Sequence, residues 1–328
     1  MTARTEVGLN AVIFAVSDQQ PRVLTVDPEQ LPEIPDALGP GIKGSGLAAL
    51  PSGPFDPAQD RTLELALRNW VQRQTNTDIG YVEQLYTFAD QGRDPRERLG
   101  GPRVLSVAYL ALVKERTLDV THSSWQDCYP FLPWEDWRAG RPDIIGELEG
   151  ALDQWIDTDN RSRRAQRRER VDICFGLGNA GWDGYRVLER YELLYEAGLV
   201  EEYWLDLGDT TPQGPVFGAP MAYDHRRILA TGLGRIRGKL RYRPVVFELI
   251  ERDFTLMGLQ HVVEALSGLR LHKQNFRRLV ERSGLVEGTG RLEPLTGGRP
   301  AELFRFRREV LRERRAPGVG ALAGPRSD

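Results

Sequence analysis

A short segment near the C-terminus concentrates side chains that can bind nucleic acid. Lys273, Gln274, Asn275, Arg277 and Arg278 all fall within residues 273–278. Guanidinium and amide groups present two hydrogen-bonding groups in one plane and can pair with base edges, whereas an ammonium group acts on phosphate as a point charge. The segment therefore predicts a nucleic-acid contact. The alternative is a basic helix face that is only solvated.

The apolar residues around this segment predict how it is held. Phe276, Leu279 and Val280 are spaced as one face of a helix over about 272–282, so burying them turns the polar residues outward. A second apolar helical face precedes it at 256–266. The two segments predict a helix, a turn and a second helix.

The residues that follow predict a strand hairpin. Leu285 and Val286 begin it, a loop is expected over 287–298, and apolar and polar residues alternate over 301–307. Two helices followed by such a hairpin form the outline of a winged helix. Arg299, between glycines and a proline, is expected at the wing, where it could reach a groove of DNA.

Composition and charge are consistent with this interpretation. The chain has 328 residues, 40% of them apolar, which suffices for about two domains. The segment 270–315 holds thirteen Lys and Arg against six Glu, so it carries +7 while the rest carries −10. A basic end on an acidic body favours a local polyanion-binding surface.

Location and thiol chemistry can also be predicted. No apolar run approaches the roughly 20 residues of a membrane span, and no secretion signal is visible at the N-terminus, so a cytoplasmic protein without membrane contact is expected. Cys128 and Cys174 lie far apart, which favours two buried thiols over a disulfide or a zinc site.

The first 115 residues predict a mixed α/β region. Runs of β-branched and aromatic residues predict strands at 7–16, 22–26, 81–88 and 103–113. A helix is expected over 60–74, because its apolar residues share one face, with Asp60 as its N-terminal cap. The Pro- and Gly-rich residues 27–58 are expected to form a loop.

Residues 134–217 predict a helical insertion, and a further helix is expected over 224–239. Within the insertion, helical periodicity marks 144–156 and 185–197, with the basic run 160–170 as their connection. The glycines of 176–181 match the spacing of a dinucleotide fingerprint. That fingerprint needs a strand before it and a doubly wound sheet around it, and no other βαβ unit is visible. A turn between helices is the favoured interpretation.

Several stretches resemble the Nudix-related transcriptional regulators of NAD metabolism, including the longer alphaproteobacterial relatives that control de novo NAD synthesis genes. FTLMGLQHVVEALSGLRLHKQNFRRLVERSGLVEGTG at 254–290 and GGRPAELFRFRRE at 297–309 are similar to the family's C-terminal winged helix. AYDHRRIL at 222–229 and RYRPVVFEL at 241–249 match its link between domains, and SVAYLALV at 106–113 matches a central strand.

The resemblance implies an α+β fold: a Nudix-like mixed-sheet α/β/α sandwich with a helical insertion, followed by a winged helix-turn-helix domain. The expected boundaries are 1–133 for the first part of the Nudix-like domain, 134–217 for the insertion, 218–243 for the end of that domain with a linking helix, 244–312 for the winged helix and 313–328 for a disordered tail.

The Nudix motif itself is degenerate in this chain. An active Nudix helix clusters glutamates on one face to hold Mg²⁺ against a pyrophosphate. Arg68 keeps the motif's arginine and Asp60 stands at its first glutamate, but Gln72 and Arg73 replace the metal-binding pair. The motif therefore predicts no catalysis, no metal site and no required cofactor. Asp60, Arg68, Gln72 and Arg73 are candidate nucleotide contacts, with a structural salt bridge as the alternative for both arginines.

The resemblance also implies a function. It points to a homodimeric regulator, expected to be a repressor of NAD synthesis or salvage genes, that binds a double-stranded DNA operator and responds to ADP-ribose, NAD or ATP. One alternative is a Nudix hydrolase of ADP-ribose or a related compound with relocated metal ligands among Glu83, Glu97 and Asp56. Another is a winged helix that binds a protein partner.

Overall fold

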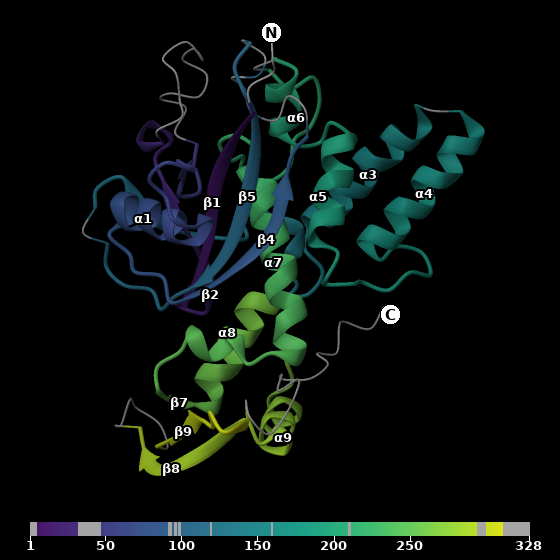
Figure 1. The fold of residues 1–328 in the computed structure, drawn as a ribbon. Helices are drawn as coiled ribbons and strands as arrows, with labels where there is room; N and C mark the ends of the chain where they lie inside the picture. The colour runs from purple at the N-terminus through teal and green to yellow at the C-terminus, as the bar shows by residue number, and fades with distance from the viewer. Residues whose placement is uncertain are drawn as a thin grey trace.

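The structure is a computed structural model. It describes residues 5–310 apart from 32–46, 91–93, 95–96, 98–99, 119, 159, 209–210 and 294–299. Arg299 and the expected tail at 313–328 lie outside the described residues, as does part of the expected loop at 27–58. Figure 1 shows a sheet with helices on both faces and a smaller helix-and-strand unit below it.

A mixed sheet forms the centre of the N-terminal part. Its strands are β1 (Thr5–Ser17), β2 (Gln20–Val26), β3 (Ser52–Pro54), β4 (Tyr81–Phe88), β5 (Arg103–Leu112) and β6 (Ser123–Asp127). The order is β4-β5-β1-β2-β6, with β3 also paired to β1. Strands β1 and β5 run parallel, and the other pairs are antiparallel. The predicted strands are confirmed, and the β1–β2 turn places Asp18 and Gln19 at positive φ, as a two-residue hairpin turn requires.

Alternation along β1 builds two cores. Leu9, Ala11 and Ile13 face one side, where they pack with the buried face of α1 (Leu63–Thr75). Val12 and Phe14 face the other side, toward α7 (His225–Tyr242). The sheet is therefore sandwiched between helices (Figure 1), as expected for a Nudix-like sandwich.

The start of α1 corrects one expectation. Thr62, not Asp60, caps the helix: its backbone is extended and its Oγ1 accepts a hydrogen bond from the Leu65 amide at 3.2 Å. The Asp60 carboxylate instead accepts from the Asp56 amide at 2.9 Å. Asp60 therefore stabilises the turn before the helix, and the helix itself begins at Leu63, after the cap at Thr62.

Residues 134–217, the expected insertion, contain four α-helices in the part that the structure describes. They are α3 (Ile144–Asp157), α4 (Arg161–Phe175), α5 (Val187–Glu196) and α6 (Glu201–Asp206). The basic run, expected as a connection, is part of α4, whose N-cap Asn160 accepts from the Arg163 amide at 3.1 Å. Residues 171–175 end this helix, and Gly176 closes it at φ +66°. The turn interpretation of the glycines is confirmed, because no strand precedes them.

The C-terminal unit has the expected helices and one strand more than expected. Its elements are β7 (Asp253–Thr255), α8 (Leu256–Ser267), α9 (Lys273–Ser283), β8 (Val286–Leu292) and β9 (Glu302–Phe306), with the sheet order β7-β9-β8. The loop predicted from residue 287 is wrong, since β8 continues to Leu292 through an irregularity after Gly288. Backbone hydrogen bonds to β9 hold this polar segment in the strand. Because its residues show no apolar alternation, the sequence pattern does not predict the strand.

Short 3₁₀ helices lie at Pro28–Gln30, Pro133–Glu135 and Val245–Glu248. Both cysteines are free and buried, as expected, and burial raises the pKa of the Cys128 thiol to about 12. Within the described part of the chain, no helix combines the length and the apolar character that crossing a bilayer would require.

Candidate functional site

Helix α9 presents its polar residues to solvent. Phe276 and Val280 are 3% and 1% exposed and join the main core, with Leu279 half-buried beside them. These three residues hold the helix against the domain, so the predicted burial pattern is confirmed. The residues left exposed are Lys273, Gln274, Asn275, Arg277 and Arg278.

Among the residues that the structure describes, the exposed side chains of α9 form their hydrogen bonds within the helix itself. Arg277 Nε donates to Glu281 Oε1 at 2.8 Å, and Arg278 Nη2 donates to Asn275 Oδ1 at 3.3 Å. Both partners of the Arg277 pair are about half exposed, at 58% and 48%. Exposed pairs of this kind contribute about 0–1 kcal/mol. A phosphate or a base edge could therefore replace these partners at little cost.

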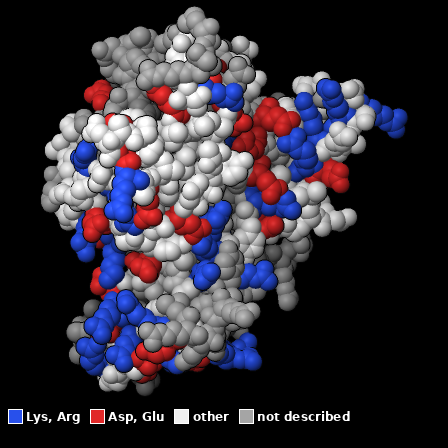
Figure 2. Space-filling view, viewed as in Figure 1, with Lys and Arg blue, Asp and Glu red and all other residues white. Residues whose placement is uncertain are grey.

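The wing side of the domain adds further cations. Arg291 on β8 pairs with Asp253, and Arg305 on β9 pairs with Glu287 at 2.6 Å. Figure 2 shows Lys and Arg side chains gathered at the end of the molecule formed by the winged helix, with acidic side chains among them. Arg291 is not predicted as a contact from the sequence, because it falls in a segment expected to be loop.

A groove runs along this basic region. It lies between the start of α8, the N-terminal half of α9 and strand β9, and Lys273, Phe276 and Arg277 line its α9 side. Thr255 caps α8 by accepting from the Gly258 amide at 3.0 Å. The groove therefore brings two cationic side chains and the Glu302 carboxylate to the start of α8, and Lys273 and Arg277 are its groups that could contact a DNA phosphate.

In the N-terminal domain, Arg68 on α1 is engaged by its own chain. Its guanidinium donates to Glu64 Oε1 at 3.0 and 2.8 Å, to the Gly80 carbonyl at 3.0 Å and to the Ile79 carbonyl. These contacts fasten the loop after α1 to the helix. They favour the structural alternative for Arg68.

The other predicted ligand residues also have local partners. Gln72 Nε2 donates to Asn76 Oδ1 at 2.8 Å, and the Arg73 guanidinium lies 5.3 Å from the centroid of the Trp70 ring. Asp60 belongs to the turn before the helix. The contacts described for these residues do not bring them together, and their nucleotide-binding role stays a prediction.

A small polar cavity lies on the face of the sheet opposite α1, among residues that the sequence did not mark as ligand contacts. Asn10 on β1 and Ser106 on β5 line it and are hydrogen-bonded to each other. His225 lines it from the start of α7 and accepts at Nδ1 from the Leu50 amide at 2.9 Å. Ser52 lines it from β3. The available signal was that Asn10 and Ser106 interrupt two otherwise apolar strands.

Two of the carboxylates considered as relocated metal ligands, Glu83 and Asp56, pair with other groups of the protein. Glu83 accepts from Arg235 at 2.8 Å and pairs with Lys239 at 2.5 Å, both on α7. Burial alone would raise the pKa of Glu83, but these cations and the Tyr81 hydroxyl hold it below its usual value. Asp56 accepts from the Ala58 amide and from Gln59 within its own turn. Glu83 and Asp56 thus have structural partners.

The comparison with known families identifies the C-terminal domain. Residues 246–306 match the family described as the NrtR DNA-binding winged helix domain. A relative named ADPR responsive transcriptional repressor NtrR, from Acinetobacter baylyi, is 38% identical over 86 residues, which are 26% of this chain and 34% of that protein. The chain thus matches about a third of the length of this curated relative.

Solved structures extend the likeness to nearly the whole chain. The NrtR of Shewanella oneidensis in complex with a 27mer DNA aligns with a TM-score of 0.54 at 22% identity, over 92% of this chain and 94% of that one. A MutT/nudix family protein from Enterococcus faecalis aligns with a TM-score of 0.50 at 15% identity, over 94% and 88%. At such identities the likeness shows the fold alone, and the expected fold class is confirmed. Residues 246–306 therefore match the NrtR DNA-binding winged helix domain, and the chain as a whole has a fold similar to that of Shewanella oneidensis NrtR.

Proposed function

We propose that this chain is a DNA-binding transcriptional repressor whose Nudix-like domain senses an NAD-related nucleotide. The observation that carries the proposal is the exposed polar face of α9, within a domain that matches the NrtR DNA-binding family. A relative named as an ADPR-responsive repressor and a structure of a similar protein with DNA support it. Genes of NAD synthesis or salvage are the proposed targets, and ADP-ribose is the first candidate effector, ahead of NAD and ATP.

Helix α9 is the proposed reader of the major groove. Asn275 and Arg278 are the best placed to pair with base edges, because both offer planar groups and are neighbours on the exposed face. Lys273, at the start of the helix and on the groove, is the proposed phosphate contact. Arg299 is proposed to act from the wing. A homodimer would place two such helices about one helical turn of DNA apart, or a multiple of it.

The Nudix-like domain, proposed to comprise 1–133 and 218–243, would bind the nucleotide without hydrolysing it. Gln72 and Arg73 stand at the positions of a metal-binding glutamate pair, and an arginine there repels a cation. Two seats compete for the nucleotide: the exposed side of α1, and the surface at the mouth of the polar cavity lined by Asn10, Ser106 and His225. The cavity itself has a volume of about 30 Å³, so only a small polar group of the ligand would enter it.

Titration of a fluorescent duplex from the promoter of the chain's own or a neighbouring NAD gene tests this proposal. The parent chain should bind that duplex more tightly than a scrambled duplex of the same length, and ADP-ribose should change the affinity. Equal binding to both duplexes would contradict the proposed operator recognition. Rapid turnover of ADP-ribose with Mg²⁺, lost when Glu83 is changed to Gln, would instead support the hydrolase.

A further inference from the structure

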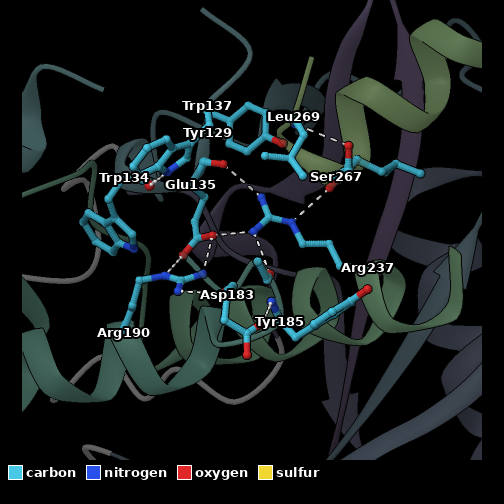
Figure 3. A network of polar contacts seen from close by, with 12 residues as sticks. Tyr129, Trp134, Glu135, Trp137, Asp183, Tyr185, Arg190, Arg237, Ser267 and Leu269 are labelled. Atoms are coloured by element: carbon cyan, nitrogen blue, oxygen red, sulfur yellow. Dashed lines mark hydrogen bonds and ion pairs between the residues drawn. The ribbon is translucent and has the colours of Figure 1, made fainter. Parts of the chain in front are cut away.

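A buried ion triad joins three parts of the chain. Glu135, between β6 and α3, is surrounded by Arg190 of α5 and Arg237 of α7, and the three side chains are 0%, 0% and 3% exposed. Arg190 donates from Nε and Nη2 to the two carboxylate oxygens at 2.5 and 2.9 Å, and Arg237 donates from Nη1 to Oε2 (Figure 3). Neither DNA reading nor nucleotide binding requires these residues to be ionic.

The triad carries two positive charges against one negative charge, so its remaining donors need other acceptors. Arg190 donates to the carbonyls of Cys174 and Asp183, both at 2.9 Å. Arg237 donates to the carbonyls of Gly184 at 3.0 Å and Leu266 at 3.1 Å. Because the excess charge is stabilised only while these carbonyls stay in place, the segments that supply them are held as one unit.

One of these segments is the turn that precedes α9. Leu266 lies in the last turn of α8, which ends at Ser267, and Gly268 closes the helix at φ +71°. The Gly268 carbonyl accepts from the Trp137 amide at 2.7 Å, and the carbonyl of Ala265 accepts from the Tyr129 hydroxyl at 2.6 Å. A Cβ on Gly268 would lie 2.3 Å from the Glu135 carbonyl oxygen. The turn of the helix-turn-helix therefore rests directly on the segment that carries Glu135.

Two other segments come from the insertion. Arg190 lies on α5, and the carbonyls of 174, 183 and 184 belong to the end of α4 and the connection that follows it. Trp182 in this connection packs against Trp137 with the two rings tilted and their centroids 4.4 Å apart. The Arg190 guanidinium lies 3.9 Å from the centroid of the Trp182 ring. The insertion thus contacts the triad through charge, carbonyls and an aromatic ring.

Helix α7 connects the triad of Glu135, Arg190 and Arg237 to the polar cavity. Its N-cap Asp224 and first residue His225 line the cavity, and Arg237 follows twelve residues later on the same helix. At 1.5 Å per residue, the two ends of this stretch lie about 18 Å apart on one rigid element. A shift at the cavity would therefore move Arg237.

We propose that the insertion couples nucleotide binding to DNA binding. Through Arg190, Glu135 and Arg237 it fixes the turn before α9, so that the DNA affinity of α9 depends on whether a nucleotide is bound. This inference rests on the proposed function and adds a role for residues 134–217. Arg190, Glu135 and Arg237 are positioning residues, since they act through the turn and not on DNA.

The test compares Arg190→Met with Arg170→Met. Removing Arg190 leaves a balanced Glu135–Arg237 pair, so this variant keeps the core electrically matched. Arg170, in the same insertion, forms an exposed pair with Glu196 at 2.6 Å and serves as the control. The readout is the ratio of the DNA dissociation constants with and without ADP-ribose, a ratio of about fivefold or more in a coupled protein. The ratio should fall toward one in Arg190→Met and stay at the parent value in Arg170→Met.

An unchanged ratio in Arg190→Met would overturn the inference while leaving the proposed function intact. A parent chain that binds no operator contradicts the proposed function, and the inference with it. Hydrogen exchange on the parent covers the case in which the variant does not fold. ADP-ribose, or DNA alone, should change protection at 183–190 and at 265–269 together, and a change at the turn without one in the insertion would overturn the coupling.

Discussion

Helices α4 and α9 are both rich in arginine, yet their surroundings differ. On α4, Arg168 pairs with Asp153 of α3 at 2.7 Å and Arg170 with Glu196 of α5 at 2.6 Å, so carboxylates of neighbouring helices engage part of its positive charge. On α9, Arg277 and Arg278 instead donate to Glu281 and Asn275 of the same helix. Figure 2 shows the two signs of charge intermixed over the insertion. A count of arginines therefore does not identify a DNA-binding helix, because the neighbouring elements decide which cations remain available.

Buried arginines form a third class. Arg190 and Arg237 have the chemistry of the α9 arginines, but their donors are committed to Glu135 and to backbone carbonyls. Substitutions should therefore separate the three classes. We expect the buried arginines and their partners to affect stability and coupling, the exposed arginines of α9 to affect DNA affinity, and the exposed arginines of α4 to affect neither strongly.

The largest effect is expected from Glu135→Gln. This change leaves two buried guanidiniums without a counter-charge, which should lower the free energy of unfolding by about 3–5 kcal/mol. Urea unfolding followed by circular dichroism measures it. Glu149→Gln, which removes the exposed partner of Arg141, is the control and should cost less than about 1 kcal/mol. Equal costs for the two variants would remove the distinction between buried and exposed pairs.

The parent and Glu135→Gln should also differ in how their stability depends on pH. Burial alone would raise the pKa of Glu135, but Arg190 and Arg237 hold it below the ordinary value of 4.5. The ionised carboxylate thus contributes stability above pH 4.5, and this contribution is lost as the pH falls from 4.5 through the lowered native pKa. The stability difference between parent and Glu135→Gln should shrink over that range, and a difference that grows on acidification would contradict the assignment.

Substitutions of the exposed α9 residues should weaken DNA binding and leave stability unchanged. Asn275→Ala and Arg278→Ala should each weaken operator binding by about 1–3 kcal/mol and relax the preference at one base position. Neither should change the urea midpoint measurably, because both side chains are exposed. Competition against single-base operator variants checks the first claim. Loss of affinity without any change in preference would assign the residue to phosphate contact instead.

Lys273→Ala should have a smaller and uniform effect. As a phosphate contact, Lys273 would contribute to all sequences alike, so the ratio of operator to scrambled binding stays constant. The slope of log affinity against log salt concentration should decrease by about 0.9. A changed base preference in this variant would show that Lys273 reads sequence.

The smallest effect is expected on α4. Arg168→Ala removes one exposed pair, worth about 0–1 kcal/mol, and should leave operator affinity unchanged. Thermal unfolding and the same titration measure both quantities. A clear loss of DNA binding would show that the insertion also contacts DNA.

Sequence patterns predicted the elements that have strong periodicity and missed those that depend on distant partners. The apolar runs of β1 and β5, which are buried on both faces of the sheet, and the buried face of α9 were readable, because each pattern lies within a single element. Helix α4 was taken for a connection, since few of its residues are apolar and its arginines are held by α3 and α5. The triad could not be predicted, because Glu135 is 55 residues from Arg190 and 102 from Arg237.

One titration tests the central claim most directly, that α9 and not α4 reads DNA. The operator duplex is titrated with the parent, with Arg277→Ala/Arg278→Ala and with Arg164→Ala/Arg168→Ala. The account predicts a loss of ~30-fold or more for the α9 pair, since two sites contribute at least 1 kcal/mol each, and less than about twofold for the α4 pair. An α9 double variant that binds the operator as tightly as the parent would contradict the account.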